Sequence, residues 1–194
     1  AAQEYAESAA SLAQEQGFPY GMAGGAMLRG WALAYQGQAK EGIEQLHQGL
    51  MARRAVGAEI FRPYWLALPA EAHGTIEEPE VGLAALAEAL TLVDATGERW
   101  YEAELHRLKG ELHLAEHDPA AAESSFKTAT EIARRQQSKA WELRATMSLA
   151  RLWQRHGSRD QARDALEAVY STYTEGFTTP DLVEAKALLD GLGR

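Results

Sequence analysis

The chain has 194 residues, no cysteine and a formal net charge of −9, from 28 acidic and 19 basic residues. Without cysteine, a disulfide framework and a thiolate metal site are excluded, and the composition fits a reducing, cytoplasmic setting. The acidic balance argues against direct nucleic-acid binding. No apolar run approaches the roughly 20 residues of a membrane span, so we expect no membrane contact.

Alanine, leucine, glutamate and arginine dominate the chain and β-branched residues are sparse, which favours helix throughout. We therefore predict an all-α protein of about ten helices. In chain order, they are expected at residues 1–16, 18–37, 38–56, 60–74, 78–96, 98–116, 118–137, 138–156, 158–175 and 180–191.

Glycine, proline and capping residues mark the expected helix ends. Asp118 and Thr179 each precede a proline, and Ser158 with Gln161 has the spacing of a capping box. Pro69 falls inside the expected helix 60–74, where it predicts a kink or early break between Leu66 and Ala70. The glycines near expected helix C-termini are Gly17, Gly37, Gly57, Gly97 and Gly157.

Small residues return every 40 positions along the chain, and three further columns keep the same period. A fixed period of this length is typical of a solenoid, whose units bury their apolar faces by stacking on their neighbours. The columns are Gly30/Ala70/Gly110/Ala150, Gly42/Gly82/Ala122/Ala162, Leu46/Leu86/Phe126/Leu166 and Gly49/Ala89/Ala129/Val169.

The period divides residues 1–194 into repeats of one elongated domain. Residues 1–17 align with the second helix of a repeat, which predicts a truncated first unit, and residues 178–194 with a first-type helix that caps the array. Full repeats are expected at 18–57, 58–97, 98–137 and 138–177.

The spacing inside each unit is that of a tetratricopeptide repeat. Gly110 is followed by Ala122, Phe126 and Ala129, at offsets of 12, 16 and 19. Small residues let the two helices of a hairpin cross closely, and the bulky residue fills the space toward the next unit. We therefore predict a tetratricopeptide-like, right-handed superhelix with helices longer than those of the usual repeat of about 34 residues.

Three stretches carry a more specific likeness: TGERWYEAELHRLKGELHL (96–114), EIARRQQSKAWELRATMSLARLW (131–153) and YTEGFTTPDLVEAKALLDGL (173–192). They resemble the C-terminal tetratricopeptide region of large bacterial signalling proteins of the adenylate/guanylate cyclase-like or MalT/LuxR type. The resemblance implies a non-catalytic regulatory module that binds a protein or peptide, a candidate being the ATPase module of the same parent chain. A small-molecule effector sensor is the alternative. No cofactor is implied.

In a tetratricopeptide array the first helix of each pair lines a concave groove, so fixed offsets from the small-residue column select the candidate site. The resulting face is aromatic near the N-terminus, acidic in the middle and basic near the C-terminus. The candidate residues are Met27, Trp31, Tyr35, Tyr64, Glu71, Glu104, Arg107, Glu111, Arg144, Met147, Arg151 and Arg155.

Two groups on this face have competing interpretations. Trp31 and Tyr35 form either an aromatic platform for a ligand or a packing surface for an upstream repeat. Arg144, Arg151 and Arg155 form either a clamp for a carboxylate or phosphate, or a solvated face whose arginines pair with nearby glutamates.

The sequence shows neither a complete set of metal ligands nor a catalytic group of residues. His113 and His117 have a zinc-compatible spacing, but no third ligand is evident and His113 shares a column with Leu33, His73 and Trp153. No nucleophile–base arrangement can be argued. We expect neither an enzyme nor a metal site. A second aromatic column, Phe61, Tyr101 and Trp141, is expected to pack between repeats.

Overall fold

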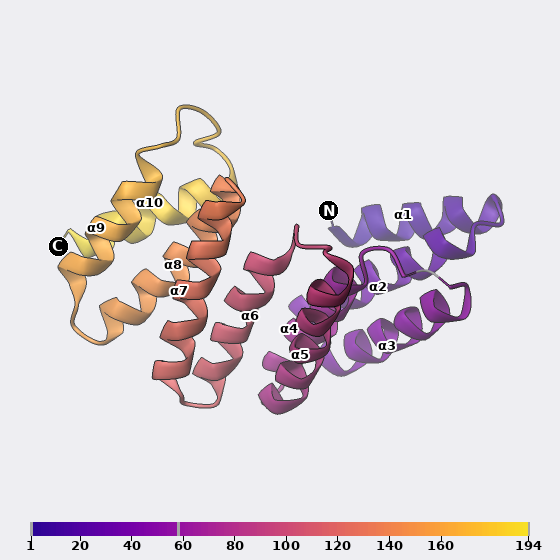
Figure 1. Ribbon diagram of the computed structural model, residues 1–194. Coiled ribbons are helices and arrows are strands. Elements are labelled where there is room, and N and C mark those ends of the chain that lie inside the picture. Colours follow the sequence, from indigo (N-terminus) through magenta and orange to yellow (C-terminus); the bar gives the residue numbers. More distant parts are fainter. Residues whose placement is uncertain (1, 58, 194) are drawn as a thin grey trace. The chain divides into compact units, whose positions relative to one another are not determined.

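A computed structural model describes residues 2–57 and 59–193, and within these ranges the regular structure is entirely helical, without strands (Figure 1). This confirms the all-α prediction and most of the expected boundaries. None of the described helices is both long and apolar enough to cross a membrane. The helices are α1 (Ala2–Glu15), α2 (Pro19–Tyr35), α3 (Ala39–Ala55), α4 (Arg62–Gly74), α5 (Pro79–Thr96), α6 (Glu102–Ala115), α7 (Pro119–Arg135), α8 (Lys139–Arg155), α9 (Arg159–Tyr170) and α10 (Pro180–Leu192).

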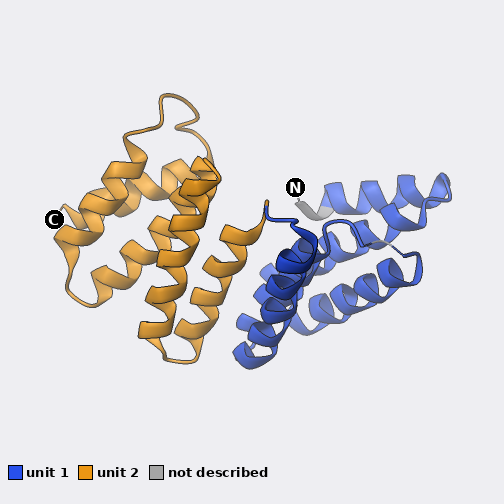
Figure 2. Ribbon diagram, viewed as in Figure 1, with its two compact units in different colours: residues 1–99 blue, residues 100–194 orange. Residues whose placement is uncertain are grey.

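The chain divides into two compact units, unit 1 over residues 1–99 and unit 2 over residues 100–194 (Figure 2). The boundary falls close to the expected border at 97/98 between the second and third repeats. Unit 1 contains α1 to α5 and unit 2 contains α6 to α10. That residues 1–194 form one repeat domain stays a prediction.

In unit 1 the α2/α3 hairpin is held by direct contact between backbones. A Cβ added at Gly30 would lie 2.7 Å from the carbonyl oxygen of Gly42, and one added at Gly42 would lie 2.8 Å from the amide nitrogen of Ala34. Neither backbone can move away without separating the helices. Two columns of the repeat therefore need glycine here because the helices cross at the closest distance.

In unit 2 the α6/α7 hairpin uses the same column differently. A Cβ added at Gly110 would meet the ring of Phe126, whose Cδ1 would lie 2.6 Å away. Phe126 itself is fully buried. Here glycine makes room for a large side chain, as the sequence spacing predicts.

The turns repeat along the chain as regularly as the helices. Gly17, Gly37, Gly57, Gly97 and Gly157 all have positive φ, which confirms their expected role at helix C-termini. The turns that lack glycine use the same left-handed backbone: Glu77, His117 and Gln137 have φ of 59°, 60° and 54°. These side chains occupy a conformation that glycine adopts with less strain.

The helix starts agree with the sequence in part. Asp118 caps α7 as predicted, because its Oδ1 accepts a hydrogen bond of 2.9 Å from the amide of Ala121. The capping box at Ser158 is wrong, since its side chain makes no cap hydrogen bond. The expected cap at Thr179 is also wrong: its hydroxyl donates instead to the carbonyl of Gly176, at 2.8 Å.

The early break predicted at Pro69 and the end predicted for the helix at 158–175 are wrong, whereas the expected span of 60–74 agrees with α4. α4 runs from Arg62 to Gly74 without the early break expected near Pro69, which is itself buried. Its buried neighbours Leu68, Ala70 and Ala72 anchor the helix in the core of unit 1, which offsets the roughly 3 kcal/mol that an internal proline costs. The helix expected at 158–175 ends at Tyr170, and a nine-residue connection, 171–179, leads to α10.

Candidate functional site

Four of the candidate residues, Trp31 and Tyr35 on α2 and Tyr64 and Glu71 on α4, form what we call the Glu71 cluster. The indole Nε1 of Trp31 donates to one oxygen of Glu71 at 2.9 Å, and the hydroxyl of Tyr35 donates to the other at 2.5 Å. The rings of Trp31 and Tyr35 lie 4.5 Å apart. One carboxylate thus holds two aromatic side chains in a fixed arrangement.

Tyr64 completes the cluster on the α4 side. Burial, and next the negative charge of Glu71, raise the pKa of the Tyr64 hydroxyl. Its ring packs edge-on against that of Trp65, with centroids 4.9 Å apart. Tyr35 remains 56% exposed, so the cluster has an aromatic surface that solvent reaches.

Met27 does not share this surface. Its side chain is fully buried in the core of unit 1, against Leu46 and Trp65. The groove position assigned to Met27 is therefore wrong, because Gly49 opposite leaves room for the methionine to turn inward between α2 and α3. Met147 of α8 is likewise buried in the core of unit 2, beside Leu143 and Leu166.

The acidic and basic candidates of unit 2 pair with one another in what we call the Glu104 network. Arg107 donates to both oxygens of Glu104, at 2.9 and 2.8 Å, and to Glu111 at 3.1 Å. Arg144 of α8 reaches Glu104 at 3.0 Å, and Ser148 donates to Glu111 at 2.6 Å. Glu104 is only 2% exposed, so its charge is balanced inside the unit.

The three arginines of α8 do not converge on one free site. Arg144 pairs with Glu104, and Arg151 pairs with Glu184 of α10 at 2.6 Å. Arg155 is exposed and has no ion pair among the described residues. Arg144 and Arg151 thus show the internal pairing that the sequence left as the alternative to a carboxylate or phosphate clamp.

The histidine pair and the second aromatic column take structural roles. His113 contacts Glu116 at 3.3 Å, and His117 lies in the left-handed turn before α7. Across residues 2–57 and 59–193, no three histidine or acidic side chains are grouped so as to hold a metal ion. Tyr101 and Trp141 pack edge to face at 5.3 Å, which confirms inter-repeat packing for that pair.

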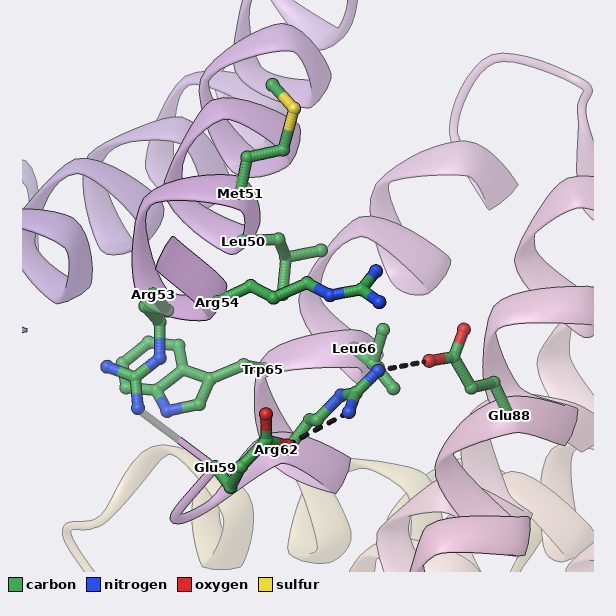
Figure 3. Close-up of a pocket in the computed structure, with 9 residues that line it drawn as sticks. All are labelled: Leu50, Met51, Arg53, Arg54, Glu59, Arg62, Trp65, Leu66 and Glu88. Carbon is green, nitrogen blue, oxygen red and sulfur yellow. Dashed lines mark hydrogen bonds and ion pairs between the residues drawn. The ribbon is translucent and has the colours of Figure 1, made fainter. Parts of the chain in front are cut away.

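Unit 1 also contains a pocket of about 190 Å³ that the sequence did not indicate (Figure 3). Arg62 is held on one side by Glu59, at 2.9 Å, and by Glu88 of α5, at 2.8 Å. Arg54 extends toward the same space, and no ion pair engages it in the part of the chain that is described. The lining residues are Leu50, Met51, Arg53, Arg54, Glu59, Arg62, Trp65, Leu66 and Glu88.

Arg53, which lines this pocket, is the most unusual residue that the sequence analysis missed. It is 2% exposed, and its guanidinium lies 4.2 Å from the ring centroids of both Tyr20 and Trp65. Its Nη2 donates to the carbonyl of Ile60 at 3.0 Å, while its Nη1 is buried without a hydrogen-bond partner. The repeat offered a signal, because Arg53 shares its column with Val93 and Ala133, both buried.

Comparisons with known proteins identify the fold and no family. No family model and no curated protein matches the chain. Among solved structures, it is similar to a Podosopora anserina protein named for the kinesin light chain and built of nearly identical TPR-like repeats. The TM-score is 0.63 at 16% identity, over 94% of this chain and 86% of that one. A substituted form of that protein gives 0.61 at 16% identity, over 94% and 85%. The chain therefore has the tetratricopeptide-like helical-repeat fold that its spacing predicts.

Proposed function

We propose that the chain is a non-catalytic scaffold that binds a protein or peptide, and that the Glu71 cluster is its principal contact. The observation that carries this proposal is the fixed, partly exposed aromatic pair Trp31 and Tyr35, held by Glu71. Rigid aromatic side chains supply a large contact area at a low cost in conformational entropy, and they are enriched where proteins bind partners. The tetratricopeptide-like fold supports a scaffold, since repeat arrays present extended binding surfaces.

The wider setting follows the sequence resemblance. We propose that the repeats are the regulatory C-terminal module of a bacterial, cytoplasmic signalling or transcription-regulating protein, with its ATPase module as a candidate partner. In this setting the exposed Arg155 of unit 2 would add a contact of its own to the partner.

A small-molecule sensor is the second candidate, and the pocket between α3, α4 and α5 favours it. Its apolar lining of Leu50, Trp65 and Leu66 lies beside Arg54, whose charge could bind a small organic acid. Its volume of about 190 Å³ is below the usual range for drug-sized ligands, which begins near 300 Å³. We therefore rank the scaffold first.

The proposal is tested by selecting binders from a random peptide library displayed on phage, followed by titration of the enriched peptides. Peptides that use the Glu71 cluster should bind the Tyr35→Ala variant about tenfold more weakly, because an exposed aromatic contact is lost. Arg54→Ala is the matched control, because Arg54 lines the pocket between α3, α4 and α5 and not the Glu71 cluster. If Y35A binds every enriched peptide as tightly as the wild type, or if no peptide is enriched, the proposal fails.

A further inference from the structure

The carboxylate of Glu71 carries a negative charge that no positive side chain among the described residues balances. Both oxygens accept hydrogen bonds from neutral donors, the indole of Trp31 and the hydroxyl of Tyr35. Within residues 2–57 and 59–193, no lysine, arginine or histidine forms an ion pair with this side chain. A half-buried carboxylate of this kind attracts a cation more strongly than one that water surrounds.

The repeat explains why the charge is left unbalanced. Glu111 stands 40 residues after Glu71, at the same position of the next repeat, and there Arg107 neutralises it at 3.1 Å. The residue at the Arg107 position in the earlier repeat is Ala67, which is fully buried. The same carboxylate therefore occurs in both repeats, but only the second repeat supplies its counter-ion.

The aromatic side chains of the cluster favour the same kind of ligand. The N–H of Trp31 and the O–H of Tyr35 both point at Glu71, so neither is available to an incoming acceptor. What these two residues offer are ring faces, whose quadrupole is negative. Ring faces beside a carboxylate attract guanidinium and ammonium groups, and repel anions. The net charge of −9 adds a long-range attraction of the same sign.

We infer that the Glu71 cluster binds a cationic side chain, arginine or lysine, of the partner. This inference rests on the proposed function and specifies the chemistry of its ligand. The guanidinium or ammonium group would contact the carboxylate of Glu71 and lie against the rings of Trp31 and Tyr35.

The experiment uses an oligoarginine peptide and the same peptide with citrulline, which is neutral and nearly isosteric, in place of arginine. Binding is followed by NMR at the indole N–H of Trp31, a signal assigned from its absence in the Trp31→Phe variant. We expect the arginine peptide to shift this signal and the citrulline peptide to bind about tenfold more weakly or not at all. An oligolysine peptide should act as the arginine peptide does.

Glu71→Gln is the decisive variant, because it removes the charge while keeping groups that can hydrogen-bond Trp31 and Tyr35. It should weaken the arginine peptide about tenfold. Glu111→Gln is the matched control: it removes one charge from the same repeat position, so it should leave the affinity within about twofold.

The outcomes separate this inference from the function on which it rests. If E71Q and E111Q weaken binding equally, or if the citrulline peptide binds as tightly as the arginine peptide, the cation site is wrong. The scaffold survives that result whenever peptides enriched from the library still lose affinity for Y35A. The scaffold and the cation site both fail if neither the library peptides nor the oligoarginine peptide lose affinity for the Y35A and E71Q variants.

Discussion

Units 1 and 2 place a glutamate at the same repeat position and use it in opposite ways. Glu71 in unit 1 holds two aromatic side chains and has no cationic partner among the described residues. Glu111 in unit 2 belongs to the Glu104 network, whose arginines pair with its carboxylates. A repeat column therefore fixes where a side chain lies, while its neighbours decide whether its charge is neutralised within the fold.

The same contrast separates the two tight hairpins. Gly30 and Gly42 let two backbones meet in unit 1, whereas Gly110 admits the ring of Phe126 in unit 2. A contact with backbone cannot be relieved by changing another side chain, but a contact with a ring can. Substitutions at these positions should therefore differ in whether a second substitution rescues them.

The largest effect is expected for Gly42→Ala in unit 1. Its methyl group would meet the carbonyl of Gly30 and the amide of Ala34, so we expect a loss of about 3 kcal/mol or more in the free energy of unfolding. Urea denaturation followed by circular dichroism measures it. Gly191→Ala is the control, since a Cβ there has no neighbour within 4 Å, and it should be neutral or slightly stabilising. A loss below about 1 kcal/mol for G42A would contradict the backbone contact.

Glu104 and Glu71 should differ clearly in their contribution to the free energy of unfolding. Glu104→Gln leaves Arg107 and Arg144 without their buried carboxylate and should cost about 3 kcal/mol. Glu71→Gln removes a charge that no cation among the described residues balances, so it should cost about 1 kcal/mol or less. Both variants can be compared in the same urea titration. Equal losses would show that the Glu71 cluster is as structural as the Glu104 network.

Gly110→Ala should cost about 2 kcal/mol because its methyl group would overlap the ring of Phe126. The double variant Gly110→Ala with Phe126→Leu should return to within about 1 kcal/mol of the wild type. It copies the pairs that neighbouring repeats already contain, Ala70 with Leu86 and Ala150 with Leu166. A double-mutant cycle measures the coupling, and purely additive losses would refute it.

The smallest effect concerns the ionisation of Tyr64. Burial is the larger cause of its raised pKa and the charge of Glu71 the smaller, so Glu71→Gln should bring the pKa only part of the way back toward its usual value near ~10. Because the folded-state pKa lies above the unfolded one, stability from this group is present below pH ~10 and lost as the pH rises through the folded pKa. NMR titration of ring-labelled tyrosine measures the shift. The pKa of Tyr173, also raised mainly by burial, should not change in this variant.

Much of the fold could be predicted because its signals are local and periodic. The glycines at positive φ and the cap at Asp118 follow from properties of single residues, and the hairpins follow from the small-residue columns. One error arose where packing overrode such a property. Pro69 should break a helix, but buried neighbours on both sides keep α4 intact.

For the candidate site, the sequence predicted which side of the first-type helices carries it, but not the contacts between its side chains. Helical offsets grouped Trp31, Tyr35 and Glu71 correctly, because residues at the same column of the two repeats in unit 1 lie side by side. The offsets could not show that Met27 and Met147 turn into the core. They also did not select Arg53. Its repeat column indicates a buried position, but its place between Tyr20 and Trp65 depends on two other helices.

The sequence alone determined the helical repeat, its period and the residues of its turns, because these depend on backbone preferences and on spacing within one helix or one hairpin. The tertiary structure decided which charges are neutralised. Pairing depends on distances of a few ångströms between side chains of different helices, and Coulomb energies change steeply over that range. The unbalanced carboxylate of Glu71 and the balanced one of Glu111 are alike in the repeat pattern and differ only in what lies beside them.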